Sequence, residues 1–231
     1  MHIPDGFLSL QVCAATYALT AIFWLFGFRG VRRVFDERHV PLMALFTAMF
    51  FAAQMMNYPI IGGTTAHLLG GPVLGFMLGP YAGLLSMTII LLLQAFIFGD
   101  GGLSTLGANV LNMGIIGVFI PYLVLVVFLK IARSKRGLYA GIFLGSFFGD
   151  LLAASSAGFE LGLSVPVFQY GIQVAVTAMA VHHSIIGIVE GIVTSIIIVA
   201  ISKSRPDLLD IPKAAPSIFG GWSYSSLVKE R

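Results

Sequence analysis

The chain has 231 residues, of which 58% are hydrophobic and only 10% are charged. Soluble globular domains carry about 25% charged residues, so the composition excludes that class and predicts an integral membrane protein with little mass outside the bilayer. The small net charge of +3 argues against nucleic-acid binding, and the single cysteine, Cys13, excludes a disulfide within the chain.

The first six residues, MHIPDG, are polar and lack the basic start of a secretory signal, so we expect them to be retained. A histidine in second position is a ready chelator. The α-amine of Met1, the amide nitrogen of His2 and its Nδ1 can bind one ion through a five-membered and a six-membered ring. These three coplanar nitrogens suit square-planar Ni(II) or Cu(II), and not Mg, Ca or tetrahedral Zn. The alternative is that His2 is an ordinary solvated residue.

Residues 7–28 form an apolar run about as long as one bilayer crossing. The loop 30–39 that follows is rich in arginine, which predicts a cytoplasmic loop and an external N-terminus. The second span, 40–59, has small residues four apart on one face, where another helix could approach closely. Packing inside the protein is the alternative for this face, which consists of Ala44, Ala48 and Ala52.

The external loop 57–71, NYPIIGGTTAHLLGG, contains His67. A lone loop histidine is usually an ordinary polar residue. His67, however, is expected on the same side of the membrane as Met1 and His2, so it is the candidate for the fourth nitrogen ligand.

Residues 68–98 are too long for one crossing, because a single helix would measure about 46 Å against about 30 Å of hydrocarbon. Gly79-Pro80 interrupts them, and proline is disfavoured inside a helix. Two separate crossings, 68–79 and 80–98, would also place a later basic loop in the cytoplasm. That loop contains Lys130, Arg133, Lys135 and Arg136.

The rest of the chain predicts a helix at 107–131, another at 138–157, an external loop at 158–165 carrying Glu160, and a last helix at 166–202. We therefore expect an all-α membrane bundle of seven segments, with the N-terminus outside and the C-terminus in the cytoplasm. Residues 1–202 would form one transmembrane metal-capture domain, with residues 1–6 as its metal-binding loop. Residues 203–231 would be a cytoplasmic tail along the surface.

Polar residues inside apolar segments need partners, and hydrogen bonds between helices are the simplest explanation for them. Some of them could instead hold the metal ligands in place; the candidates are Asp5, Gln94, Asn109, His183 and Glu190. His183 and Glu190 share a helix face and could pair. Together with His182 they also suggest a metalloenzyme, although their spacing fits no HExxH motif. No GxxxxGK[ST] motif is present, so the chain has no P-loop ATP site.

Four segments, MHIPDGFLS, GGTTAHLLGG, QAFIFGDGGLSTLGANVLNMG and HHSIIGIVEG, closely resemble one family. This family is the substrate-capture (S) component of energy-coupling-factor nickel and cobalt transporters, the NikM/CbiM type. The resemblance implies a transport protein and not an enzyme, built as a vitamin S-component-like six-helix core with one extra N-terminal helix. It also implies that the metal ligands are the Met1 amine, the amide nitrogen and Nδ1 of His2, and an imidazole nitrogen of His67.

The partners that the resemblance implies are a transmembrane coupling (T) component, docked on the alanine face, two cytoplasmic ATPase subunits and a small accessory membrane subunit. The expected location is the plasma membrane of a prokaryote. The transported substrate would be Ni(II), with Co(II) as the alternative, and a stand-alone channel or permease is the rival function. Because the amine and imidazole must be neutral to bind, and the amide must lose its proton, we expect metal affinity to fall as pH drops.

Overall fold

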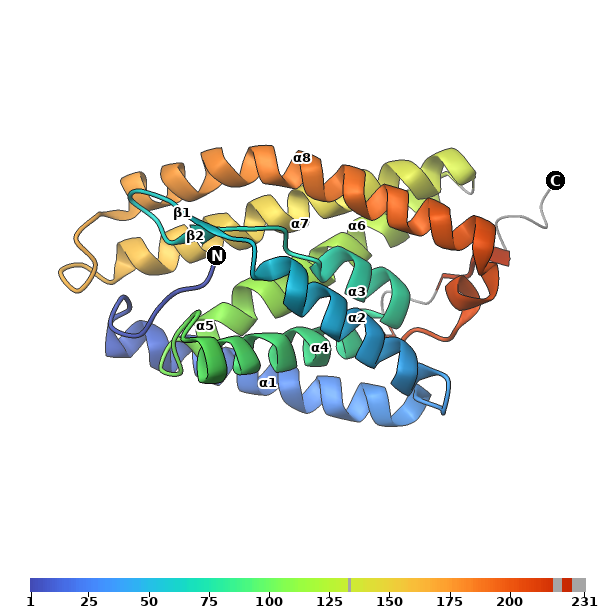
Figure 1. The fold of residues 1–231 in the computed structure, drawn as a ribbon, viewed down its shortest axis with the longest axis horizontal. Helices are drawn as coiled ribbons and strands as arrows, with labels where there is room; N and C mark the ends of the chain where they lie inside the picture. The colour runs from blue at the N-terminus through green and yellow to red at the C-terminus, as the bar shows by residue number, and fades with distance from the viewer. Residues whose placement is uncertain (133, 218–221, 226–231) are drawn as a thin grey trace.

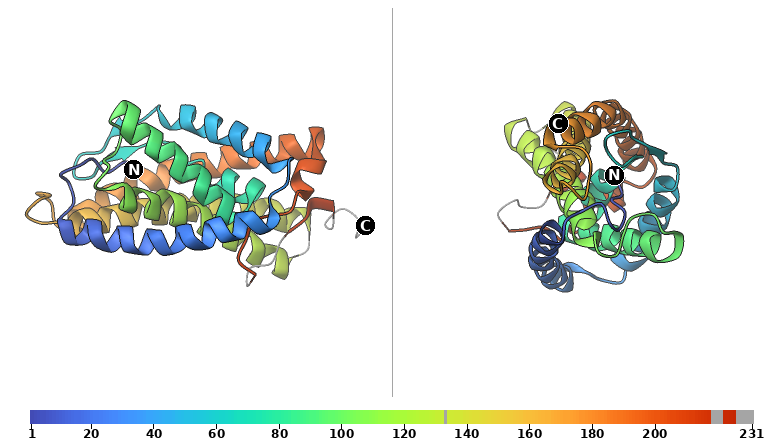
Figure 2. Two further views of the ribbon diagram at one scale, coloured as in Figure 1. Left: turned by 90° about the horizontal axis from the view of Figure 1, so that it is seen from below. Right: turned by 90° about the vertical axis from the view of Figure 1, so that its left-hand side faces the viewer.

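Long apolar helices run side by side along the molecule and surround the N-terminus (Figures 1 and 2). The computed structural model describes residues 1–132, 134–217 and 222–225. Arg133 of the predicted basic loop lies outside the described residues, as do positions 218–221 and 226–231 of the predicted tail. The elements in chain order are α1 (Leu10–Val34), α2 (His39–Gln54), β1 (Tyr58–Pro59), β2 (Thr65–Ala66), α3 (Gly71–Leu78), α4 (Pro80–Leu93), η1 (Gln94–Phe98), α5 (Leu106–Asn109), η2 (Val110–Ile116), α6 (Gly117–Ile131), α7 (Lys135–Leu163), α8 (Ile172–Ser204) and η3 (Pro206–Asp210).

Five helices in the described part of the chain are long and apolar enough to cross a membrane, by length and composition. Helix α2, with 16 residues, is a shorter apolar helix. The expected all-α, multi-pass membrane architecture is therefore confirmed. The only sheet among the described residues is an antiparallel pair of two-residue strands, β1 and β2. The five helices are Leu10–Val34, Pro80–Phe98, Leu106–Ile131, Lys135–Leu163 and Ile172–Ser204.

Helix α1 begins after Ser9, whose side chain accepts a hydrogen bond from the Val12 amide. It continues to Val34, six residues beyond the predicted end at 28. Arg32 and Arg33 therefore lie in its last turn and not in a loop. Their positive charge there complements the helix dipole.

The stretch expected as a short helix from residue 68 becomes helical only at Gly71, which corrects that prediction. The chain between β2 and α3 is non-helical, and its backbone is satisfied by side chains of other elements. Glu190 accepts hydrogen bonds from the amides of Leu69 and Gly70 at 2.8 and 2.9 Å, and Gln54 donates to the Leu69 carbonyl at 2.6 Å. Such pairing is what non-helical backbone inside a membrane bundle requires.

The predicted break at Gly79-Pro80 is present. Gly79 has a φ of +85°, and a Cβ atom there would lie 2.5 Å from the backbone nitrogen of Ala214. Ala214 donates to the Leu78 carbonyl at 3.1 Å and accepts from the Tyr81 amide at 2.8 Å. The beginning of the tail is thus packed into the α3–α4 junction, with Leu209 and Ala214 fully buried, and does not simply lie along the surface as predicted.

Helix α7 extends to Leu163, so the predicted external loop at 158–165 is wrong. Glu160 lies inside this helix, buried, and accepts a 2.7 Å hydrogen bond from Asn112. A Cβ atom on Gly158 would lie 2.7 Å from the Ala175 carbonyl oxygen, so the absent side chain lets α7 and α8 pack closely past the predicted end. The last helix begins correspondingly later than predicted, at Ile172.

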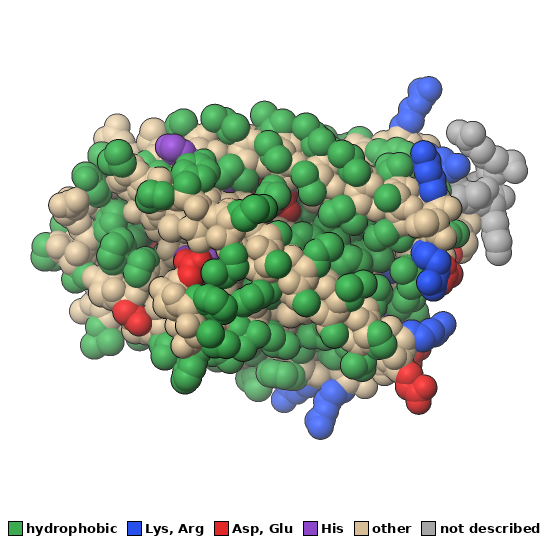
Figure 3. Space-filling view, in the orientation of Figure 1, with side chains coloured by type: hydrophobic (Ala, Val, Ile, Leu, Met, Phe, Trp, Pro, Cys, Tyr) green, Lys and Arg blue, Asp and Glu red, His purple; other side chains and the backbone are tan. Residues whose placement is uncertain are grey.

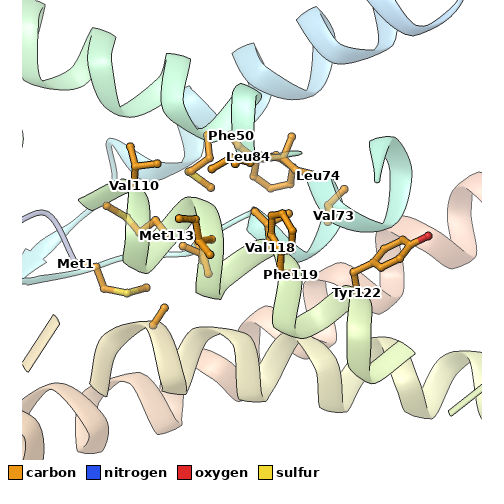
Figure 4. Close-up of a cluster of buried hydrophobic side chains, with 14 of the residues drawn as sticks. Met1, Phe50, Val73, Leu74, Leu84, Val110, Met113, Val118, Phe119 and Tyr122 are labelled. Atoms are coloured by element: carbon orange, nitrogen blue, oxygen red, sulfur yellow. The ribbon is translucent and has the colours of Figure 1, made fainter. Parts of the chain in front are cut away.

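The core extends to the first residue of the chain. Met1 and Ile3 are fully buried, and the Met1 side chain joins the apolar cluster that contains Val110 and Met113 (Figure 4). Most Lys and Arg side chains visible in Figure 3 gather at the opposite end of the molecule, where α1 turns into α2. The N-terminal segment and the basic end therefore lie at opposite ends of the helices.

Candidate metal site

The N-terminal segment enters the bundle beside β2 (Figure 1). The side chain of Asn109 holds it there by two hydrogen bonds to the backbone of Ile3. The amide of Ile3 donates to Asn109 Oδ1 at 2.9 Å, and Asn109 Nδ2 donates to the Ile3 carbonyl at 3.1 Å. The same carbonyl accepts from the Gly102 amide at 3.0 Å and from the Thr105 hydroxyl. Asn109 therefore lies at the site, where its side chain fixes the backbone that follows His2.

Asp5 fastens the next residues to the loop 99–105. Its carboxylate accepts from the amides of Leu103 and Ser104 at 3.2 and 2.7 Å, and from the Ser104 hydroxyl. The Ser104 hydroxyl, with these amides, lowers the pKa of Asp5. Gly6 has a φ of +83°, and the Phe7 amide bonds the Pro4 carbonyl. The backbone thus makes a turn at Asp5-Gly6, which directs the first residues inward.

The α-amine of Met1 is buried against Thr65. It donates to the carbonyl oxygen of Thr65 and, at 3.0 Å, to its hydroxyl oxygen. Burial lowers the pKa of the amine to about 4, against the opposing influence of Asp150 and Asp100. At neutral pH the amine is therefore uncharged, with two hydrogens and one lone pair. The two hydrogens account for the two hydrogen bonds, which leaves the lone pair for another partner.

His2 is held by Gln94, a residue singled out from the sequence. Its Nε2 lies 2.9 Å from Gln94 Oε1. An amide oxygen can only accept, so this hydrogen-bond network assigns the hydrogen to Nε2 and a free lone pair to Nδ1. Nδ1 is buried without a hydrogen-bond partner. Burial, followed by the charge of the amine, lowers the pKa of His2 to about 3.

His67 lies beside His2. Its Nδ1 donates to the Leu68 carbonyl at 2.9 Å, and its Nε2 is buried without a hydrogen-bond partner. The two ring centroids are 4.6 Å apart, with 28° between the ring planes. Two imidazoles bound to one metal ion in neighbouring positions have centres about 4 to 5 Å apart when each metal–nitrogen bond is about 2 Å. The structure therefore brings Met1, His2 and His67 together.

Asp100 also lies at the site, and the sequence analysis missed it. Its Oδ1 is 3.4 Å from His2 Nδ1, and its Oδ2 accepts from Asn57 at 2.8 Å. Partial burial raises the pKa of this carboxyl. The sequence signal was weak, because GDGG is typical of any turn.

His183 and Glu190 have separate partners and do not form the expected pair. His183 Nδ1 lies 3.1 Å from the Asp150 carboxylate, both fully buried, whereas Glu190 binds the backbone before α3. His182 Nδ1 faces the Tyr58 hydroxyl at 3.4 Å. Within the described residues no group of three His, Cys, Asp or Glu side chains is arranged to hold a metal ion. The geometry gives no support to a metalloenzyme centre built on these residues.

Ala44, Ala48 and Ala52 are all exposed on α2. The opposite face of the helix, with Leu42, Phe46 and Phe50, is buried in the bundle. The alanine face therefore points outward.

The chain matches the family model described as "Cobalt uptake substrate-specific transmembrane region" over residues 2–208. It is 41% identical over 216 residues to a protein of Archaeoglobus fulgidus provisionally named as the fused nickel transport protein NikMN, covering 94% of this chain and 70% of the relative. It is 39% identical over 231 residues to the fused nickel transport protein NikMN of Rhodobacter capsulatus, covering 94% of this chain and 66% of the relative. The chain thus spans about two thirds of the length of these two fused relatives.

The fold is also similar to the crystal structure of a truncated transition metal transporter. The TM-score is 0.83 at 37% sequence identity, covering 88% of this chain and 99% of that one.

Proposed function

Because the chain belongs to the family of cobalt uptake substrate-specific transmembrane regions, we propose that it captures one divalent transition-metal ion, Ni(II), for uptake across the membrane. Membership of this family makes it a component of metal transport and not an enzyme. The observation that carries the proposal is the meeting of buried nitrogens at one place. The Met1 amine, His2 Nδ1 and His67 Nε2 each keep a free lone pair. The groups that hold these residues accept hydrogen bonds from them and donate none to these nitrogens.

The proposed ligands are the amine of Met1, the deprotonated amide nitrogen and Nδ1 of His2, and Nε2 of His67. Gln94 and the Leu68 carbonyl support them, since each accepts the hydrogen of the nitrogen that does not bind. Such partners fix the tautomer and orientation of ligating histidines. Asn109 and Asp5 hold the backbone that follows His2, and Glu190 holds the backbone just after His67.

Nickel is the favoured substrate on chemical grounds. Low-spin d⁸ Ni(II) gains from four nitrogens in one plane more than Co(II) or Zn(II) does. The names of the two fused relatives refer to nickel, whereas the family description refers to cobalt. A cobalt-specific protein of the same type is therefore the alternative.

We further propose that the protein is the substrate-binding S component of an energy-coupling-factor transporter. Its partners would be a transmembrane coupling component, two cytoplasmic ATPase subunits and a small accessory membrane subunit. The outward alanine face of α2 offers a close-packing surface for the coupling component. Residues 1–202 would act as the capture domain. The collection of basic residues at the end opposite the site supports a cytoplasmic position for that end and for the tail 203–231.

The test compares Ni(II) binding by the native chain with binding by a chain whose Met1 amine is acetylated. Acetylation turns the amine into an amide and changes no side chain, whereas an added residue would place His2 third and create a new four-nitrogen chelate. Calorimetry and the visible absorption band of square-planar Ni(II) report on the site. We expect affinity to fall at least about 100-fold and the band to disappear, because a three-nitrogen chelate is lost.

His67→Ala is the companion variant, expected to weaken binding while keeping the N-terminal chelate. His182→Ala is the matched control, since His182 contacts Tyr58 outside the proposed set. Unchanged binding by the acetylated chain would refute the Met1 amine as a ligand. Uptake by this chain alone, insensitive to ATP depletion, would favour the rival channel or permease.

A further inference from the structure

The Asp100 carboxylate and the free nitrogen of His2 face each other. Asp100 Oδ1 lies 3.4 Å from His2 Nδ1, the nitrogen that Gln94 leaves with a lone pair. Two such electron-rich atoms repel each other where water is excluded, and a cation placed between them makes both contacts attractive. Atoms that bind one metal ion in neighbouring positions lie about 3 Å apart when each bond is about 2 Å. The observed separation is close to this value.

Asp100 differs from the proposed ligands in its access to solvent. Its side chain is 17% exposed, whereas that of His2 is 1% exposed. Asn57 donates to Asp100 Oδ2 and so orients the carboxylate with Oδ1 toward the site. Asp100 therefore meets water on one side and the buried nitrogens on the other.

We propose that Asp100 is a relay ligand, which binds the hydrated cation first and passes it to His2 Nδ1 and the N-terminal nitrogens. The inference rests on the proposed function and adds the route by which the ion reaches the site. A carboxylate raises the local concentration of a divalent cation and replaces one of its waters. As the nitrogens bind, the remaining waters leave, the His2 amide proton passes to solvent, and the bond to Asp100 breaks. Low-spin Ni(II) in a square plane has no strong need for a fifth ligand.

The test is rapid mixing of Ni(II) with the purified full chain, followed through the square-planar absorption band. In Asp100→Asn we expect the association rate constant to fall at least about 10-fold. Because Asp100 does not bind the ion in the final site, the equilibrium affinity should change little, so the dissociation rate constant should fall by a similar factor and the band should keep its position. Asp100→Glu retains the carboxylate and should recover most of the association rate. Glu37→Gln removes one negative charge at the opposite end and should match the native chain.

Native association kinetics in Asp100→Asn would overturn the relay while leaving the capture site intact. A shifted absorption band in that variant would overturn it as well, because Asp100 would then belong to the final ligand set. Thermal unfolding verifies that each variant is folded. If Asp100→Asn does not fold, the association rate of Asp100→Glu is compared with that of Glu37→Gln, since moving the carboxylate at position 100 should change the rate and removing the distant one should not. No Ni(II) binding by the native chain would instead refute the proposed function, and the relay with it.

Discussion

The α-amine of Met1 and the imidazole of His2 lose their affinity for protons by being buried. Their pKa values fall to about 4 and about 3, with desolvation as the largest cause. In water the two groups would have pKa values of about 8 and about 6.5, so the amine would compete with the metal for a proton at pH 7. Inside the protein both are already neutral between pH 6 and pH 8. The folded chain has therefore deprotonated these two ligands before the ion arrives.

The neutral state of these two ligands predicts how many protons are released when Ni(II) binds. Only the His2 amide still has to release a proton when it binds Ni(II), so we expect about one proton released per ion and an affinity that falls about tenfold for each pH unit between pH 8 and pH 6. Calorimetry in buffers of different ionisation enthalpy measures the number. A release of two protons would show that the amine is charged in the metal-free protein. No release, with pH-independent affinity, would exclude the amide nitrogen as a ligand.

The segment between β2 and α3 is the element that positions His67. Helical backbone would satisfy its own hydrogen bonds, but this segment depends on Gln54 and Glu190. Glu190 lies on α8, more than one hundred residues away in the sequence, and its two carboxylate oxygens each accept one amide. The site is thus supported by a contact between two elements, and the position of His67 follows from it.

Glu190→Ala would leave the amides of Leu69 and Gly70 without their partner. Each buried unpaired group costs about 1 to 3 kcal/mol, so we expect the two amides to cost about 2 to 6 kcal/mol in stability and Ni(II) binding to weaken. Thermal unfolding in detergent and calorimetry measure the two effects. Glu190→Gln keeps one acceptor oxygen and should lie between the native chain and Glu190→Ala. A melting temperature of Glu190→Ala equal to the native value would show that these hydrogen bonds are not needed.

At the scale of the whole molecule, the ends of the bundle differ in charge. Basic side chains gather at one end, and the N-terminal site lies at the other (Figures 1 and 3). The orientation proposed from this asymmetry can be tested with single cysteines in a Cys13→Ala background. We expect Val167→Cys, in the loop before α8, to react with a membrane-impermeant thiol reagent on intact cells, and Glu37→Cys to react only after permeabilisation. The reverse pattern would invert the proposed topology.

The sequence was sufficient for those features that depend on local pattern. Apolar runs predicted most of the helices, Gly79-Pro80 predicted the break before α4, and the position of His2 next to the amine predicted a chelate whose groups the fold brings together with His67. Helix ends were less accurate. The glycines near the end of α7 are typical of loops, and only their close contacts with α8 show that they belong to a helix.

Contacts across the fold could not be predicted. In the sequence, Asp100 is a residue of an ordinary glycine turn, and only the fold shows that it lies next to His2. Asp150 sits in an apolar run with no sequence sign that His183 is its partner. The tail has a composition typical of a surface segment, yet Ala214 fills the space left by Gly79. In each case the partner is more than thirty residues away, and sequence periodicity carries no information about it.

The burial of the first three residues inside the ring of helices also bears on permeability (Figure 2). Those residues occupy the central space at the end that holds the site, where a water-filled path for protons or sodium ions would have to begin. A membrane containing many idle copies of such a protein is expected to retain its ion gradients. Each delivered metal ion would then require one full cycle of a carrier, so the rate of delivery would saturate as the ion concentration rises, at a maximum set by the number of copies.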